Sequence, residues 1–357
     1  MKARIIIGAC LGDEGKGTVV ARYTKNAGKT LNVLTNGGSQ RGHSVLTESG
    51  DITYHHFGSG THLDADNYYS RFYILNPMQF TLEYNSLLTK PGFVGYDKNC
   101  MWSTMYDMLA NVIVNEAKNA HGTCGMGIWN TITRYRAGIC MPFGDFMKLD
   151  EPCKHMFLDK VRLFYEAKTV VPEKFRNIWY NYDMVFHFLE DCEFMYGHMK
   201  ECSLDSSMEY DTVIFENGQG LMLADTGEDR LDRTPSDTGI SYGLALAKGM
   251  GVSDTDITAH YVTRPYLTRH GDGVVDGETS RDNLSAGVKD DRNNIWNEFQ
   301  GEFRYGKLDI GALKNRIDGD CRGMNYEIEL THCDEMDRTA EFRKVFGDIN
   351  AYDTPLV

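Results

Sequence analysis

Short apolar runs followed by glycine-rich or polar turns dominate the pattern of this chain. Residues 3–8 and 31–35 form two such runs, and a helical pattern over Gly17–Ala27 separates them. Continuous apolar runs are typical of buried strands, and a strand–helix–strand order is typical of a parallel sheet. The same pattern predicts further buried strands at Thr212–Phe215, Thr258–Thr263 and Tyr326–Leu330.

The turns after these runs predict one site. In an open parallel sheet the carboxyl ends of the strands lie at one edge, and ligands bind there. At least four of the apolar runs end in polar turns, so we expect these turns to gather: 8–18, 36–44, 216–220 and 331–334.

The rest of the pattern predicts additions to this sheet. Residues 101–200 favour a mainly helical insertion, and the polar stretch 276–296 is typical of a loop. We therefore expect an α/β fold: a single large domain over residues 1–357, with a mostly parallel central sheet, P-loop-like glycine-rich turns and helical insertions.

Composition and net charge argue against some classes of binding partner. The 357 residues are 41% hydrophobic and 25% charged, which is typical of a globular protein. A formal net charge of −14 argues against binding polymeric nucleic acid. No apolar run reaches membrane-spanning length, and the nine cysteines lack paired spacing. We expect no membrane partner and a cytoplasmic location, which would be the host cytoplasm if the chain is phage-encoded.

The first turn, Gly12-Asp13-Glu14-Gly15-Lys16-Gly17-Thr18, favours phosphate chemistry. Glycines and a helix N-terminus suit an anion, and Lys16 adds a positive charge. Asp13 and Glu14 would repel phosphate unless a metal or a proton transfer uses them. The spacing is not that of a standard P-loop, and an ordinary strand-to-helix turn is the alternative.

The second turn carries His43 between glycines, at Asn36–Ser44. If the sheet is parallel, His43 lies at the same edge as Asp13, where the pair could abstract a proton and stabilise charge on a transferring group. A solvated histidine on a surface loop is the alternative. Two later turns are less specific: residues 122–127 before Arg136 could bind a second phosphate, and Asp334 could read a purine ring or simply end a strand.

Taken together and in order, these turns resemble adenylosuccinate synthetase over about residues 3–340. The family's Gly-Asp-Glu-Gly-Lys-Gly is matched by Gly12–Gly17, and its second turn by Gly37–Ser44. Further matches are Gly58–Gly60, Gly122–Gly127, Glu216–Gly220, Arg233–Asp237, Tyr266–Gly273, Arg304–Asp309 and Thr331–Asp334.

The resemblance implies a ligase that joins L-aspartate to C6 of a purine nucleotide. Asp13 would remove the N1 proton, the 6-oxygen would attack the γ-phosphate of a nucleoside triphosphate, and aspartate would displace the resulting 6-phosphoryl group. His43 would stabilise the transferring phosphoryl group. Mg²⁺ would be the cofactor, held by Asp13 and the Gly42 carbonyl, and the enzyme would be a homodimer.

Each remaining site residue also follows from the resemblance. Lys16 and Gln219 complete the catalytic set, and Gln219 should face the purine 6-oxygen. Thr268, Arg269 and Arg304 would bind aspartate and triphosphate. Arg136 would reach the monophosphate from a second subunit. The other implied nucleotide-binding residues are Gly12, Glu14, Gly15, Gly17, Thr18, Gln40, Gly42, Ser44, Thr123, Cys124, Thr234 and Asp334.

Departures from the family cluster in the substrate pockets. Ser39-Gln40-Arg41 replaces His-Asn-Ala, Cys124 replaces a threonine, and His332 replaces the lysine of the guanine-reading element. The aspartate loop shrinks to Gln300–Arg304. A compact, divergent chain is similar to the phage branch that joins aspartate to dGMP with ATP or dATP, to make 2-aminoadenine precursors. Some members of that branch replace the first-turn Asp, which this chain keeps.

We therefore predict a ligase acting on dGMP with ATP or dATP. The first alternative is an adenylosuccinate synthetase that uses IMP and GTP. Alternatives of another class are a GTPase-like switch, which would hydrolyse nucleotide without aspartate, and a non-catalytic nucleotide-binding protein.

Overall fold

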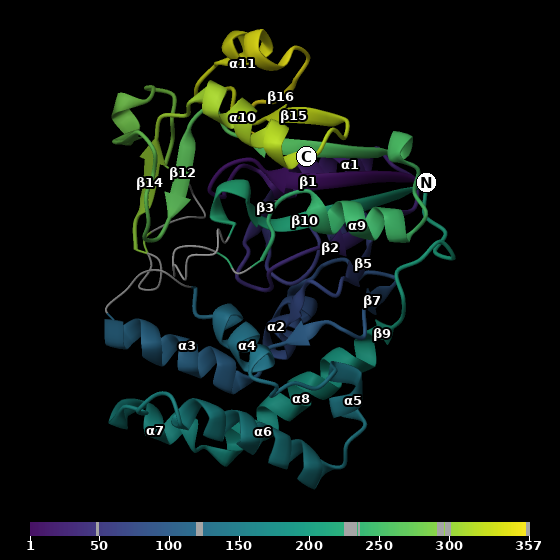
Figure 1. Ribbon diagram of the computed structural model, residues 1–357, viewed down its shortest axis with the longest axis vertical. Helices are drawn as coiled ribbons and strands as arrows, with labels where there is room; N and C mark the ends of the chain where they lie inside the picture. Colours follow the sequence, from purple (N-terminus) through teal and green to yellow (C-terminus); the bar gives the residue numbers. More distant parts are fainter. Residues whose placement is uncertain are drawn as a thin grey trace.

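A computed structural model describes residues 1–47, 50–118, 124–224, 234, 236–290, 296 and 301–354 of the chain. Within them, a nine-stranded sheet has the order β16-β15-β11-β1-β10-β2-β5-β7-β9, and every neighbouring pair is parallel. The predicted α/β fold with a mostly parallel central sheet is therefore confirmed (Figure 1). The strands of this sheet are β1 (Lys2–Gly8), β2 (Thr30–Leu34), β5 (Asp66–Tyr69), β7 (Val94–Tyr96), β9 (Lys200–Glu201), β10 (Thr212–Gly220), β11 (Ile257–Thr263), β15 (Tyr326–Leu330) and β16 (Asn350–Ala351).

Helices cover both faces of the sheet because its central strands are apolar on both sides. Ile6 of β1 packs with Val19 and Val20 of helix α1 (Lys16–Lys25). The alternate residues Ile5 and Ile7 belong to a second core on the other face. That core includes side chains of α9 (Ser241–Gly249), α10 (Ile310–Asp320) and α11 (Thr339–Phe346).

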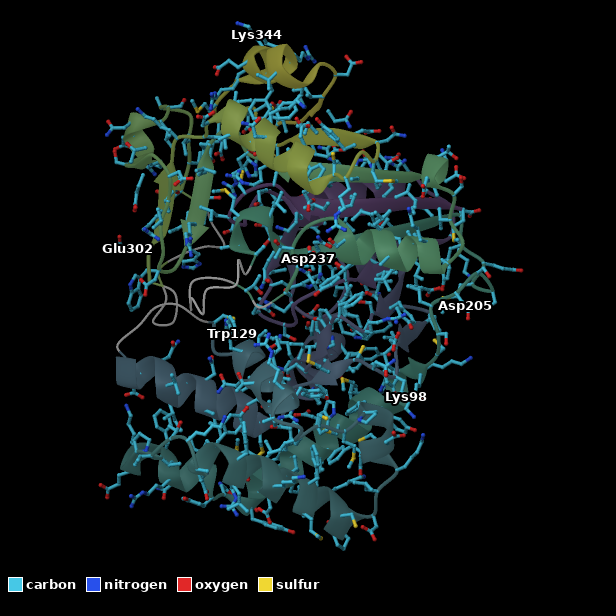
Figure 2. All side chains as sticks on the ribbon, in the orientation of Figure 1. Lys98, Trp129, Asp205, Asp237, Glu302 and Lys344 are labelled. Atoms are coloured by element: carbon cyan, nitrogen blue, oxygen red, sulfur yellow. The ribbon has the colours of Figure 1, made fainter. Side chains whose placement is uncertain are left out.

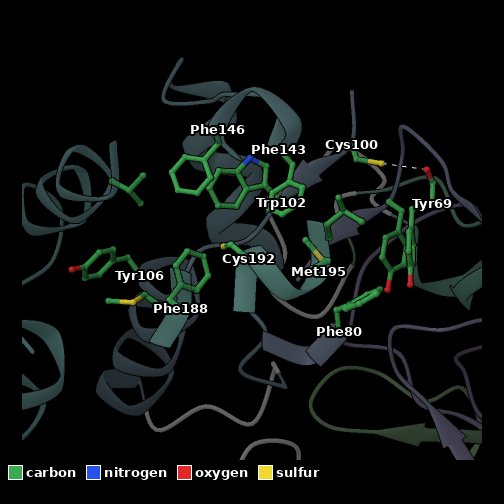
Figure 3. Close-up of a cluster of buried hydrophobic side chains, with 14 of the residues drawn as sticks. Tyr69, Phe80, Cys100, Trp102, Tyr106, Phe143, Phe146, Phe188, Cys192 and Met195 are labelled. Carbon is green, nitrogen blue, oxygen red and sulfur yellow. Dashed lines mark hydrogen bonds between the residues drawn. The ribbon is translucent and has the colours of Figure 1, made fainter. Parts of the chain in front are cut away.

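A group of helices lies beyond the β5–β7–β9 side of the sheet (Figure 1). Its aromatic core, with Trp102, Phe143 and Phe188, continues into Tyr69 of the sheet (Figure 3). Tyr96 of the sheet belongs to the same cluster. These helices are α2 (Pro77–Ser86), α3 (Met105–Lys118), α4 (Ile128–Arg136), α5 (Phe143–Met147), α6 (Glu151–Glu166), α7 (Glu173–Trp179) and α8 (Tyr182–His198). In the described part of the chain, no helix combines the length and the apolar character that crossing a membrane requires.

Three small sheets complete the fold. β12 (Leu267–His270), β14 (Phe303–Gly306) and β13 (Glu278–Thr279) form an antiparallel sheet. β3 (His43–Thr47) pairs with β4 (Gly50–Tyr54), and β6 (Ile74–Leu75) with β8 (Met101–Trp102). The short strand β13 lies within 276–296, where a loop is predicted, and residues 291–295 lie outside the described ranges.

One predicted turn is wrong. Residues 216–220 continue strand β10 rather than leaving it, and Gly220 pairs with Gly8. A polar segment can stay inside a central strand here because buried partners satisfy it. Asn217, for example, donates to the carbonyls of Thr238 and Gly239.

Candidate functional site

The first turn is held in a backbone conformation that few residue types adopt. Gly12, Asp13 and Gly15 have φ angles of 112°, 59° and 91°. Glycine adopts positive φ without strain, and aspartate is among the residues that tolerate the left-handed region. Helix α1 begins directly after Gly15, and no described side chain caps its N-terminus. Its first N–H groups therefore point toward the turn, as in an anion-binding cradle.

A buried ion pair shapes the inside of this turn. Glu14 and Lys16 are 2% and 4% exposed, and their charged atoms lie 2.8 Å apart. Glu14 also accepts hydrogen bonds from the backbone N–H groups of Cys10 and Gly12. Burial acts to raise the pKa of Glu14, but Lys16 and the Gly12 N–H outweigh it and lower the pKa below its usual value. Glu14 is thus a carboxylate that holds the turn together from within.

Three side chains from other elements fix the outside of the same turn. Arg264, after β11, donates from Nε to the Asp13 carbonyl at 2.6 Å. Thr268, in β12, donates to the Gly12 carbonyl at 3.1 Å, and Thr331, after β15, donates to the Glu14 carbonyl at 2.7 Å. These contacts hold the turn at the carboxyl edge of the sheet, where it is expected.

His43 lies in a buried charge network beside the first turn. Its Nδ1 is 2.6 Å from Glu216 Oε1, and its Nε2 is 3.3 Å from the Gly218 carbonyl. Arg41 Nη1 is 3.3 Å from the same Glu216 oxygen. Burial lowers the pKa of His43 to about 4, although Glu216 acts in the opposite direction. Each ring nitrogen thus faces an oxygen acceptor, and the Nδ1–H donates to the Glu216 carboxylate.

Glu216 is the centre of this network and is fully buried. Ser59 donates to it from Oγ at 2.6 Å and from its backbone N–H at 3.0 Å, and Asn32 Nδ2 donates at 2.9 Å. Burial acts to raise the pKa of Glu216, but Arg41 and His43 outweigh it and hold the pKa well below the usual range. Glu216 therefore stays ionised and fixes the orientation of the His43 ring.

The turns converge as predicted. A Cβ on Gly17 would lie 2.7 Å from the Ser44 carbonyl, so α1 packs directly on β3. A Cβ on Gly220 would lie 2.2 Å from the Cys10 carbonyl, and one on Gly15 would lie 3.4 Å from Thr331. Four segments therefore meet at one edge of the sheet: the first turn, the second turn, residues 216–220 and the 331–334 turn.

Two glutamines leave buried oxygens open beside these turns. Gln219 Oε1 and Gln40 Oε1 are buried and have no hydrogen-bond partner among the described residues. Gln40 lies against Gly37, whose added Cβ would be 2.8 Å from its Nε2. Buried acceptors without partners are costly, so a bound group that donates to them fits this place.

For the other predicted nucleotide-binding residues, the structure gives a position but few contacts that indicate a role. Thr234 is buried and forms an isolated β-bridge with Ala224. Cys124 is half-buried, and burial raises the pKa of its thiol to about 11. Arg136, the last residue of α4, is exposed. Thr123 lies outside the described residues. Figure 2 labels Trp129, near the start of the same helix α4, at the boundary between the sheet and the helices below it.

The predicted aspartate-binding and base-reading side chains are engaged within the protein. Arg304 donates to the Gly271 and Gly273 carbonyls and pairs with Glu278. Arg269 donates to the Val274 carbonyl at 3.1 Å. The Asp334 carboxylate accepts from both the backbone and the hydroxyl of Thr354.

Sequence reasoning assigned no role to Arg41, Glu216 and Arg264, although each lies within a motif that it singled out. For Glu216 and Arg264 the usable signal was a charged residue inside or directly after a buried strand, where a charge needs a partner; Arg41, in the loop before β3, gives no such signal. The partner could not be named, because His43 and Glu216 are 173 positions apart.

The donor set at this edge suits Mg²⁺. The implied ligands, the Asp13 carboxylate and the Gly42 carbonyl, are both oxygen atoms, which Mg²⁺ prefers. A second group of ligand-type residues, His260, Glu327 and Glu329, does not suit a metal. His260 Nε2 lies 3.0 Å from Arg4 Nη1 and Nδ1 lies 2.8 Å from Glu329 Oε1, so both ring nitrogens are already engaged.

Comparison with known proteins agrees with this geometry. A protein-family model described as adenylosuccinate synthetase matches residues 5–345. An adenylosuccinate synthetase of Lactobacillus acidophilus is 28% identical over 289 residues, which cover 76% of this chain and 64% of that relative. The chain thus spans less than two thirds of that relative's length.

Two solved structures share the fold. The fully ligated adenylosuccinate synthetase of Plasmodium falciparum matches with a TM-score of 0.68 and 19% identity, over 95% of this chain and 78% of that one. The succinoaminodeoxyadenylate synthetase of cyanophage S-2L, bound to dGMP and to dATP as an energy donor, matches with a TM-score of 0.64 and 11% identity. That match covers 99% of this chain and 91% of the cyanophage chain.

Proposed function

Because the chain belongs to the adenylosuccinate synthetase family, we propose that it joins L-aspartate to C6 of a purine nucleoside monophosphate in the cytoplasm. The observation that carries the proposal is the meeting of the Asp13 turn, His43 and Gln219 at one edge of the sheet. The energy comes from a nucleoside triphosphate.

The first step activates the purine 6-oxygen. The Asp13 carboxylate takes the N1 proton, and the 6-oxygen bonds to the γ-phosphorus as the bond to the diphosphate oxygen breaks. Lys16 and the N–H groups at the start of α1 neutralise charge on the phosphates. His43, oriented by Glu216, stabilises the transferring group, and Gln219 contacts the 6-oxygen side of the purine. Asp13 and the Gly42 carbonyl would hold Mg²⁺, which would supply charge neutralisation to the phosphates.

The second step forms the carbon–nitrogen bond. The amine of aspartate attacks C6, the C6–O bond breaks, and phosphate leaves. Thr268, Arg269 and Arg304 lie in or beside the β12–β14 sheet and are the proposed contacts for aspartate and triphosphate. Arg136 is the proposed contact from the second subunit of a homodimer, and its exposure at the end of α4 is compatible with reaching another chain.

We favour dGMP as the acceptor and ATP or dATP as the donor. The shared fold of the cyanophage enzyme bound to dGMP and dATP supports this choice. The Asp334 environment bears on the donor alone: Thr354 donates twice to Oδ1 and Lys289 Nζ lies 3.4 Å from Oδ2, so both carboxylate oxygens already have partners, which favours a donor other than GTP. IMP with GTP is the alternative, since the sequence relatives are adenylosuccinate synthetases.

A substrate panel tests this choice. Phosphate release and succinylated product are measured for dGMP, GMP and IMP, each with ATP, dATP and GTP, in the presence of Mg²⁺ and aspartate. We expect dGMP with ATP or dATP to give at least about tenfold higher kcat/KM than IMP with GTP, a difference of about 1.4 kcal/mol. A preference for IMP with GTP would reverse the substrate assignment, and no coupled product with any pair would reject the ligase itself.

Asp334→Asn tests the donor site separately. If Asp334 holds Thr354 rather than a guanine ring, we expect the ATP-dependent rate to change by less than about twofold. Asp337→Asn is the matched control, because Asp337 caps a neighbouring N–H, that of Thr339, on the same segment. A loss of GTP-dependent activity confined to Asp334→Asn would show that this carboxylate reads guanine.

A further inference from the structure

The 331–334 turn packs directly on the phosphate cradle of the first turn. Thr331 Oγ1 donates to the Glu14 carbonyl at 2.7 Å, and a Cβ on Gly15 would lie 3.7 Å from His332 Cε1. Gly15 is the residue that directly precedes helix α1. The His332 ring therefore borders the cradle in which the proposed triphosphate would lie.

Asp334, the carboxylate of this turn, is already used within the protein. Thr354 donates to Oδ1 from its backbone N–H and from its hydroxyl, and Lys289 Nζ lies 3.4 Å from Oδ2. Thr354 follows β16, which pairs with β15 at the edge of the central sheet (Figure 1). A bound base would have to displace these donors, so the structure favours another group of the turn as the reader of the base.

His332 presents one nitrogen that is open to a ligand. The residue is 8% exposed, and its Nδ1 lies 2.8 Å from Thr331 Oγ1. Because Thr331 gives its own hydroxyl hydrogen to the Glu14 carbonyl, the donor in this pair is the His332 Nδ1–H, which leaves Nε2 unprotonated in the neutral ring. Among the described residues Nε2 has no hydrogen-bond partner, and it is not one of the enclosed polar atoms, so a ligand can reach it.

Two further features keep this ring an acceptor. Burial, with Arg264 acting in the same direction, lowers the pKa of His332 well below its usual value and so favours the neutral ring. His332 also has a φ of 58°, in the left-handed region that is strained for most residues. Such a conformation persists only where the surroundings fix it. The ring is thus held with its Nδ1 toward Thr331 and its Nε2 lone pair free.

The bases of the candidate triphosphates differ in what they offer such an acceptor. At its 6-position adenine carries an amino group, which donates, whereas guanine carries an oxygen, which accepts. The donors of guanine are its N1–H and its 2-amino group, a neighbouring pair that suits the two oxygens of a free carboxylate. A single unprotonated nitrogen beside an engaged carboxylate therefore suits adenine.

We propose that His332 selects adenine in the nucleoside triphosphate, by accepting a hydrogen bond at Nε2 from the 6-amino group. The inference rests on the proposed function, because it places the triphosphate in the first-turn cradle. It adds a specificity-determining residue to that function. It also gives a physical reason for the histidine that this chain carries in place of the lysine of the guanine-reading element.

Nucleotide binding tests the proposal without requiring ligation. Titration calorimetry measures the binding of ATP, GTP and purine riboside triphosphate, which is ATP without its 6-amino group, to the full chain with Mg²⁺ but without dGMP or aspartate. We expect ATP to bind about tenfold more tightly than either of the others, the effect of one hydrogen bond to a buried acceptor. Equal binding of ATP and purine riboside triphosphate, or tighter binding of GTP, would overturn the proposal. No binding of any triphosphate would reject the proposed function as well.

Two variants of His332 locate the contact. His332→Asn keeps an N–H donor for Thr331, tolerates the positive φ and removes Nε2, so ATP and purine riboside triphosphate should bind within about twofold of each other. His332→Gln, whose amide oxygen can lie near the position of Nε2, should restore part of the preference. His187→Asn changes an exposed histidine of α8 and should leave the preference unchanged.

The ratio of the two affinities separates base reading from a structural role. If His332→Asn leaves that ratio unchanged, whether or not both affinities fall, His332 only supports the turn and the proposal is overturned. The ligase proposal stands in that case, because ATP still binds and the substrate panel tests ligation separately.

Discussion

Asp13→Asn should lower the rate of ligation by about 10³-fold, the range in which a general base contributes. The substitution replaces a proton acceptor by a neutral amide of similar shape. It should leave the backbone intact, because asparagine tolerates the left-handed conformation that Asp13 adopts at a φ of 59°. The Asp13 carbonyl, held by Arg264, is also unchanged.

Binding measurements separate the chemical role from a structural one. Titration of dGMP and of ATP in the absence of Mg²⁺ should show affinities within about threefold of the unsubstituted chain, so the loss appears in kcat. Asp64→Asn is the matched control, because Asp64 has a φ of 63° but lies in the turn after Thr61–Leu63. Loss of nucleotide binding equal to the loss of rate would contradict the base assignment. Aspartate-independent phosphate release by the unsubstituted chain would favour a GTPase-like switch.

The sequence predicts the central sheet because the apolar residues that mark each strand lie within the strand itself. β1, β2 and β11 are largely apolar and almost wholly buried, and β15 is buried over its last three residues; the observed bounds of all four strands lie within two residues of the predicted ones. The helix of the first turn begins one residue before the predicted start. Glycine and apolar patterns are local, so they can be recognised without a structure.

The site was less predictable because its key contacts are not local. The segment after Phe215 has turn composition, yet it remains in β10 because Glu216 and Asn217 find buried partners on other elements. In the sequence, Arg41 is a departure from the family pattern within a polar loop. In the structure, it is a buried partner of Glu216. Only the folded chain shows that this arginine belongs beside His43.

Glu216→Gln should lower both stability and activity. Removing one charge from a fully buried network leaves Arg41 uncompensated, which costs about 3–5 kcal/mol in comparable pairs. Denaturant unfolding should therefore give a lower midpoint than for the unsubstituted chain. Glu209→Gln, which removes an exposed carboxylate shortly before β10, should leave the midpoint unchanged.

A second substitution should recover part of the lost stability. Arg41→Met, combined with Glu216→Gln, removes the unpaired buried cation, so the double variant should be less destabilised than the sum of the two single ones. Strict additivity would contradict a coupled pair.

Glu216 acts on catalysis through His43, so its effect should appear in kcat and not in substrate binding. With Gln at 216, the His43 Nδ1–H loses its charged acceptor at 2.6 Å, and the imidazole is no longer fixed toward the transferring group. We expect kcat to fall by about 100-fold while KM for the nucleotides changes by less than about threefold. The measurement is made at a temperature well below the midpoint of the variant, so that all molecules are folded. An unchanged kcat in the folded variant would show that Glu216 only stabilises the fold and that His43 is oriented without it.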